Sequence, residues 1–166
     1  MSEKEIVSPE STVSYEGLFE PKELFRIIQK WLKENHHDFV EKEAFEKAID
    51  NKRFVKYSLE SFKKINDYAK FIIKLKITLS NLEDVVVEHE NQKLPMCKGK
   101  VSVSLTGILE SDYENRWETK PVYFFLRTVF NKFIFKTEMS YLKNRLKGEI
   151  NGLKFEIKSF LNLYKF

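Results

Sequence analysis

A cluster of acidic and aromatic residues around position 115 holds the side chains best suited to chemistry. Carboxylates beside a tyrosine and a tryptophan could form a general acid–base pair or a platform for a sugar. An enzyme here would need Asp112 and Glu114 or Glu118 to converge in a pocket with at least one perturbed pKa. The alternative is a solvated loop whose rings pack down while the acids face water, and the usual exposure of acidic residues favours it. The cluster comprises Glu110, Asp112, Tyr113, Glu114, Arg116, Trp117 and Glu118.

Residues that bind metals, hold phosphates or act as nucleophiles are few and widely spaced. The soft metal ligands are His36, His37, His89 and Cys97, and none stands in a CxxC or HExxH motif. None of the five glycines belongs to a GxGxxG or GxxxxGK loop, and no GxSxG elbow occurs. We therefore expect no catalytic residue, metal site or cofactor, and a protein that is not an enzyme is favoured.

Basic residues gather in the C-terminal third of the chain. Residues 120–166 hold ten basic and three acidic residues, a net +7, which leaves −3 for residues 1–119. A basic helix with an aromatic side could contact RNA or an anionic lipid surface. An ordinary core-facing helix with a basic outer side is favoured, because no RNA-binding motif occurs. The candidate anion-contact residues are Arg127, Lys132, Lys136, Lys143, Arg145 and Lys147.

The N-terminal part of the chain predicts a tail followed by a helix. Residues 1–14 are polar, include Pro9 and show no periodicity, so we expect a disordered tail. The remainder, residues 15–166, is expected to form a single domain. A helix is predicted over 20–35, because Pro21 suits the first helical position and apolar residues recur at helical spacing.

The middle of the chain alternates between apolar and polar residues, which is typical of strands with one dry face. Such strands are predicted around 55–59, 71–79 and 101–105, with a separate short strand at 85–89. Residues 38–49 fit either a helix or a strand, and hairpin spacing to the next strand slightly favours a strand. Turns are expected at 50–52, 65–67, 90–92 and Gly99, and Gly107 predicts a bulge or bend.

Helical spacing returns after Trp117 and continues to the end of the chain. One apolar stripe starts near Pro121, Gly148 interrupts the pattern, and a second stripe follows. We expect Phe160, Leu161 and Tyr164 of the last helix to be substantially buried, because an exposed apolar terminus would cause aggregation. The predicted fold class is α+β: an antiparallel meander sheet with an N-terminal helix and C-terminal helices packed on one face.

Composition predicts a cytoplasmic protein. The single cysteine, Cys97, cannot form an internal disulfide, which favours a reducing compartment. The first residues contain no apolar stretch of signal-peptide length. No window approaches the roughly 18 uninterrupted apolar residues of a transmembrane helix.

Four segments resemble a family of small archaeal conserved proteins with no assigned function. They read VSYEGLFEPKELFRIIQKW, DYAKFIIKLKITLS, DYENRWETKPVYFFLRTVFNKFIFK and IKSFLNLYKF. The resemblance covers most of the chain after residue 13 and carries no catalytic motif. It implies an archaeal, cytoplasmic, single-domain protein and no activity.

The function that the sequence favours is a non-enzymatic binding or assembly module that acts through apolar helix faces. Apolar stripes are plentiful, and the 15 phenylalanines are more than one core needs. The partner would be another protein or a second copy in a homodimer. Two alternatives stay open: a peripheral binder of RNA or anionic lipid through the basic C-terminal third, and an enzyme that uses residues 110–118.

Overall fold

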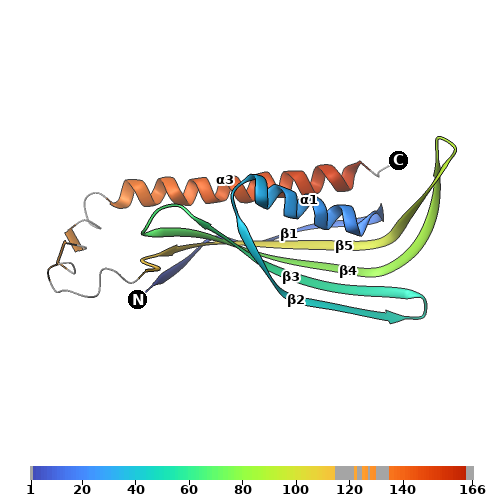
Figure 1. Ribbon diagram of the computed structural model, residues 1–166, viewed down its shortest axis with the longest axis horizontal. Coiled ribbons are helices and arrows are strands. Elements are labelled where there is room, and N and C mark those ends of the chain that lie inside the picture. The colour runs from blue at the N-terminus through green and yellow to red at the C-terminus, as the bar shows by residue number, and fades with distance from the viewer. Residues whose placement is uncertain (1, 115–121, 123–124, 127, 130–134, 164–166) are drawn as a thin grey trace.

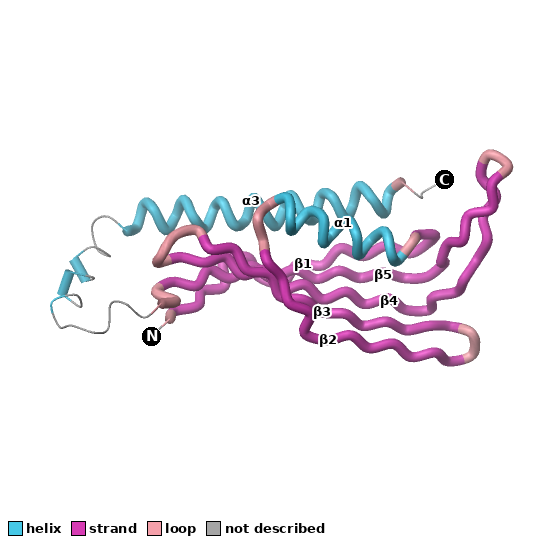
Figure 2. Tube along the Cα trace, in the orientation of Figure 1, coloured by secondary structure: helices cyan, strands magenta, loops and turns pink. Residues whose placement is uncertain are grey.

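The computed structural model describes residues 2–114, 122, 125–126, 128–129 and 135–163. Five antiparallel strands form one sheet in the order β1-β5-β4-β3-β2. Helices α1 and α3 form a second layer on one face of that sheet (Figures 1 and 2). The elements are β1 (Glu3–Phe19), α1 (Pro21–Glu34), β2 (Asp38–Ile49), β3 (Lys52–Lys64), β4 (Ala69–His89), β5 (Gln92–Ser111) and α3 (Phe135–Asn162).

The α+β class is confirmed, but the sheet is not a simple meander. Strands β2 to β5 follow one another as hairpins, whereas β1 pairs with β5 at the opposite edge from β2. The chain therefore crosses the sheet between β1 and β2, and α1 makes that crossing. Local alternation cannot predict this order, because it indicates a strand without identifying its neighbour.

The prediction of a disordered tail over residues 1–14 is wrong, because most of this segment belongs to β1. Its burial pattern is irregular: Val7 and Val13 are buried, but the register against β5 shifts twice between Ile6 and Ser11. Pro9 lies within this irregular part. The bulges hide the period-two pattern that would have indicated a strand.

Several strand and turn predictions are confirmed and others need correction. Residues 38–49 form β2, and tight turns with positive φ occur at Asp50–Asn51 and Glu90–Asn91. The segment at 85–89 is not a separate strand but the far end of β4, beyond a register shift between Ser80 and Glu83. Gly99 is not in a turn, since it pairs with Gly17 inside the sheet.

The two helices bury their apolar sides against the sheet. Helix α1 buries Leu24, Ile28 and Leu32, as its spacing predicted. Helix α3 passes through Gly148 without interruption, which corrects the expected break. Phe160 and Leu161 are buried as predicted, whereas Tyr164 and most of the helix expected at 122–134 lie outside the described residues. The core side chains of α3 are Leu142, Leu146, Ile150, Leu153, Ile157, Phe160 and Leu161.

Gly107 marks the closest approach of α3 to the sheet. A Cβ at this position would collide with the Cδ1 methyl of Ile150 and lie 3.1 Å from the Cβ of Ser8. Ser8 is its partner on β1, between the two register shifts. The irregularity lies in β1 rather than at Gly107 itself, because β5 keeps its register with β4 through Gly107. The missing side chain lets α3 pack directly on β5.

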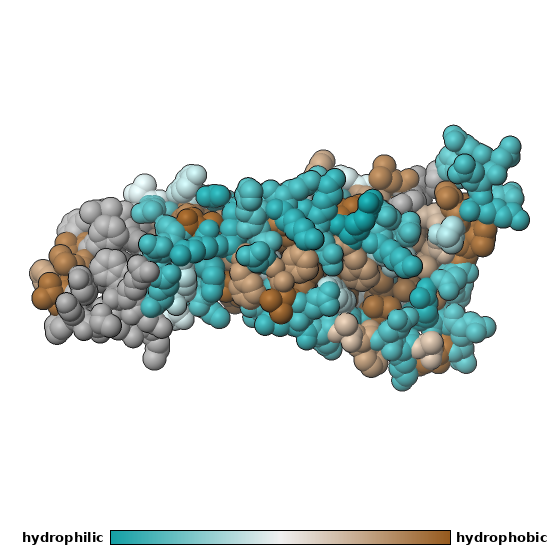
Figure 3. All heavy atoms as spheres, in the orientation of Figure 1, coloured by the Kyte–Doolittle hydropathy of each residue, from teal (hydrophilic) through white to brown (hydrophobic). Residues whose placement is uncertain are grey.

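Figure 3 shows hydrophilic residues along the outward side of the helix layer and hydrophobic residues between that layer and the strands. The far ends of β4 and β5, residues 85–96, pair only with each other among the described strands. We call this two-stranded extension the β4–β5 arm. It rises beyond the sheet past the start of α1 (Figure 1).

Candidate functional site

The described part of the acidic and aromatic cluster, residues 110–114, connects the ends of neighbouring strands. Asp112 is buried at the end of β5 with a positive φ, and its backbone N–H donates to the carbonyl of Tyr68. The Tyr113 hydroxyl donates to the Asn66 carbonyl at 2.8 Å. Glu114 forms an ion pair of 3.4 Å with Lys64. These contacts join the end of β5 to the connection between β3 and β4.

Three more members of that cluster, Arg116, Trp117 and Glu118, lie outside the described residues. Glu110 pairs with Lys70 at 2.8 Å. Glu110 and Glu114 therefore engage separate lysines. An enzyme at residues 110–118 stays a prediction.

The candidate anion-contact residues are divided by the fold. Lys143 forms a 2.7 Å ion pair with Glu5 of β1. Arg145 lies 3.6 Å from the carboxylate of Glu149 and above the ring of Phe71. Lys136 and Lys147 are exposed on α3, whereas Arg127 and Lys132 lie outside the described residues. Two of the four described cations are thus already paired with carboxylates, and binding of RNA or anionic lipid stays a prediction.

A charged cluster that the sequence did not predict lies between the sheet and α3. Glu149 accepts from His37 Nε2 at 2.8 Å and from Lys63 Nζ at 2.6 Å. Ser61 Oγ lies 3.4 Å from His37 Nδ1, and both Ser61 and His37 are buried. Burial on its own raises the pKa of the Glu149 carboxyl, but hydrogen bonds and charge from His37 and Lys63 outweigh it and hold that pKa below its ordinary value.

This cluster joins the two layers, and its serine and histidine are buried. A serine, a histidine and a carboxylate are in contact, as in a nucleophilic triad. The Ser61 hydroxyl is fully buried, however, and also lies 3.4 Å from the carbonyl oxygen of Ile73. Because a nucleophile must reach its substrate, we assign the cluster to joining α3, the start of β2 and β3.

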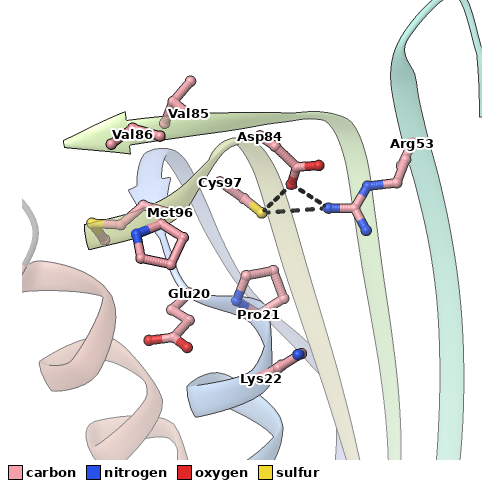
Figure 4. A pocket seen from close by; sticks show the side chains of 10 residues that line it. Glu20, Pro21, Lys22, Arg53, Asp84, Val85, Val86, Met96 and Cys97 are labelled. Atoms are coloured by element: carbon pink, nitrogen blue, oxygen red, sulfur yellow. Dashed lines mark hydrogen bonds and ion pairs between the residues drawn. The ribbon is translucent and has the colours of Figure 1, made fainter. Parts of the chain in front are cut away.

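A cavity of about 420 Å³ lies between the β4–β5 arm and the start of α1 (Figure 4). At one side Cys97 Sγ donates to Asp84 Oδ1 at 3.3 Å, and Arg53 Nη2 donates to the same oxygen at 2.6 Å. Burial and the Asp84 carboxylate raise the pKa of the Cys97 thiol, so it is a poor nucleophile. The remaining lining residues are Glu20, Pro21, Lys22, Val85, Val86, Pro95 and Met96.

Strand β2 is an exposed edge of the described sheet. It is the last strand of the sheet, and no described strand pairs with its outer edge. Every residue of β2 except Phe39 is exposed. An unpaired edge presents a row of backbone N–H and C=O groups that can pair with another strand.

Apolar side chains lie beside this free edge. Phe45 of β2 and Phe54 of β3 form an edge-to-face ring pair with centroids 6.4 Å apart. Phe45 and Ile49 remain 48% and 56% exposed, which is unusual for a strand that meets only water. We call β2 together with Phe54 the β2 edge.

The opposite edge of the sheet differs from β2. Strand β1 carries Pro9 and two register shifts, which are devices that discourage pairing with a further strand. Four of its side chains are buried, and α3 packs over it. Strand β2, by contrast, contains no proline and carries the exposed apolar side chains Phe45 and Ile49 among its charged residues.

Comparison with known protein families, curated proteins and solved structures finds no match for this chain. None of the helices, over the residues that the structure describes, has the length and apolar character needed to span a bilayer. Within the same residues, no group of three or more His, Cys, Asp and Glu side chains is arranged to hold a metal ion.

Proposed function

We propose that this chain is a non-enzymatic assembly module that binds an extended protein segment at the β2 edge. The observation that carries the proposal is a sheet edge with free backbone groups and an exposed pair of phenylalanines. An added strand would form main-chain hydrogen bonds with β2, and alternate side chains would contact Phe45 and Phe54. The core-facing apolar stripes of α1 and α3 are buried, so the proposal places the binding surface at the sheet edge rather than on those stripes.

The β2–β3 hairpin is held in position by contacts of Tyr57. The Tyr57 hydroxyl of β3 donates to Glu41 of β2 at 2.7 Å, and the Tyr57 ring packs edge-to-face on Phe25 of α1 at 5.1 Å. Burial and the Glu41 carboxylate raise the pKa of Tyr57 to about 12, so this hydrogen bond persists at neutral pH. A preorganised edge binds a strand at a lower entropic cost than a loose one.

A library of displayed random peptides tests the proposal with the full chain. Selected peptides are titrated into isotopically labelled protein, and backbone amide shifts locate the site. We expect the largest changes between Glu43 and Ile49 and at Phe54. Binding should weaken more than about tenfold in Phe45→Lys, because a charge would replace the apolar contact.

The matched control is Phe155→Lys, which replaces an aromatic side chain on α3 that is 69% exposed. It should leave peptide affinity unchanged. If the selected peptides perturb the helix layer or the β4–β5 arm, or bind Phe45→Lys as well as the parent chain, the β2 edge is not the binding surface.

A further inference from the structure

The second half of β2 is a regular strand with alternating faces. From Glu43 to Ile49 each residue pairs in sequence with β3, after a register shift between Glu41 and Glu43. Ala44 pairs with Tyr57, which packs on α1, so Ala44, Glu46 and Ala48 lie on the helix side of the sheet. Glu43, Phe45, Lys47 and Ile49 lie on the open side.

Two copies of one strand can pair antiparallel only about a two-fold axis perpendicular to the sheet, which places one residue opposite itself. With Phe45 at the axis, Glu43 of each copy lies opposite Lys47 of the other, and the two Phe45 rings meet. Opposite charges and aromatic rings at directly opposed positions both stabilise a sheet.

The neighbouring registers lack this complementarity. An axis at Glu46 opposes two glutamates, and an axis at Lys47 opposes two lysines. Like charges directly opposite each other destabilise pairing. An axis at Ala44 places Glu43 against Phe45 and carries the next pair into the irregular part of β2. Phe45 is therefore the one centre between 44 and 47 that pairs opposite charges within the regular strand.

We propose that the partner of the β2 edge is a second copy of this chain, joined by antiparallel β2–β2 pairing centred on Phe45. This inference rests on the proposed function and names its partner. The product is one continuous sheet of ten strands, since each copy contributes five. Its open side carries the Phe45–Phe54 ring pairs of both copies at the junction, flanked by two Glu43–Lys47 ion pairs.

Sedimentation of the full chain over a range of concentrations tests the inference. Because about seven residues of each copy meet, we expect a reversible dimer with a dissociation constant on the order of micromolar or weaker. Glu43→Lys and Lys47→Glu each place like charges at both ion-pair positions, so each variant alone should dimerise at least about tenfold more weakly. Phe155→Lys on α3 is the control and should dimerise as the parent chain does.

Mixing the two variants is the decisive measurement. In a mixed dimer of Glu43→Lys with Lys47→Glu, both ion-pair positions again hold opposite charges, so the mixture should dimerise more tightly than either variant alone. The double variant E43K/K47E should also recover the parent affinity. Both positions are exposed, so circular dichroism should show an unchanged fold.

The outcomes separate this inference from the proposed function. If the chain stays monomeric at all concentrations while displayed peptides still bind β2, the second copy is excluded and the assembly module stands. If the single charge reversals leave the dimer dissociation constant unchanged, the dimer uses another surface. If mixing the two variants does not restore dimerisation, the register centred on Phe45 is wrong. If no peptide binds at β2 and the chain stays monomeric, both proposals fail.

Discussion

Glu149 of α3 lies 2.8 Å from His37, although 112 positions separate the two residues in the chain. His37 follows the end of α1, and its backbone N–H donates to the carbonyl of Leu32. Lys63 of β3 pairs with the other oxygen of the same carboxylate. One acidic side chain thus connects the end of α1, the sheet and α3.

Replacement of Glu149 by glutamine should lower the free energy of unfolding by about 3 kcal/mol, because it leaves the largely buried Lys63 cation without its carboxylate. Urea denaturation at neutral pH measures the change as a shift in midpoint at an unchanged slope. Glu34→Gln is the control, since its ion pair with Lys30 is exposed and should contribute less than about 0.5 kcal/mol. Equal effects of both substitutions would refute the assigned role of Glu149.

The same carboxylate should make stability depend on pH in acid. The folded-state pKa of Glu149 lies below its ordinary value of 4.5, so ionised Glu149 stabilises the fold fully above that value. This contribution is lost as the pH falls through the lower, folded-state pKa. The stability difference between the parent chain and Glu149→Gln should therefore stay constant from about pH 6 to 5 and shrink below about pH 4.5. A constant difference down to about pH 3 would contradict the lowered pKa.

Gly107→Ala should destabilise the protein by about 1–3 kcal/mol, because the added methyl overpacks the contact between β5 and α3. Ile150→Val removes the Cδ1 methyl that the new Cβ would meet, and alone it should cost about 1 kcal/mol. In the double variant the two losses should sum to less than their separate values. Thermal or urea unfolding of all four proteins gives the coupling free energy, and strict additivity would exclude a direct clash.

Gly148→Ala should instead stabilise the protein by about 1 kcal/mol. Gly148 lies inside α3, and a Cβ there meets no atom within 4 Å. Alanine lowers the conformational entropy of the unfolded chain and has a higher helix propensity than glycine, and at this position it causes no steric clash. For a chain of this size the melting temperature should rise by about 2–4 °C, which differential scanning calorimetry can resolve. A lower melting temperature would mean that the surface at Gly148 is occupied.

Deletion of residues 157–166 should give insoluble or unfolded protein. Ile157, Phe160 and Leu161 are buried in the core, and burial of each such side chain stabilises the fold by roughly 1.5–3 kcal/mol. Their joint loss approaches the whole stability of a typical domain. Solubility after expression and the melting temperature are the measurements. A soluble truncated protein with an unchanged melting temperature would show that this part of α3 is dispensable.

The spacing of apolar side chains predicted most of the helices and strands that bury one face, because burial of one face imposes a regular spacing. The stripe Leu24, Ile28 and Leu32 indicated α1, and alternation between 71 and 79 indicated β4. Two segments lacked such a pattern for a physical reason. β1 contains bulges that shift its register, and β2 is exposed on both faces, so burial imposes no alternation on it.

The candidate sites were harder to predict than the elements. The cluster of His37, Lys63 and Glu149 joins residues from three distant segments, each of which looks like an ordinary surface residue in the sequence. The β2 edge was missed because a strand becomes an edge only when the order of all five strands is known. The sole local signal was Phe45 and Ile49 in a segment whose helical or extended character was open.

By itself the sequence determined an α+β chain, the position of α1, most of the strands and the burial of Phe160 and Leu161 near the end of the described chain. These follow from side-chain periodicity, which acts over a few residues. Only the tertiary structure decided that β1 pairs with β5, that Glu149 meets His37 and Lys63, and that β2 is left as an open edge. Those outcomes depend on long-range pairing, in which each strand and helix is placed by the burial of all the others.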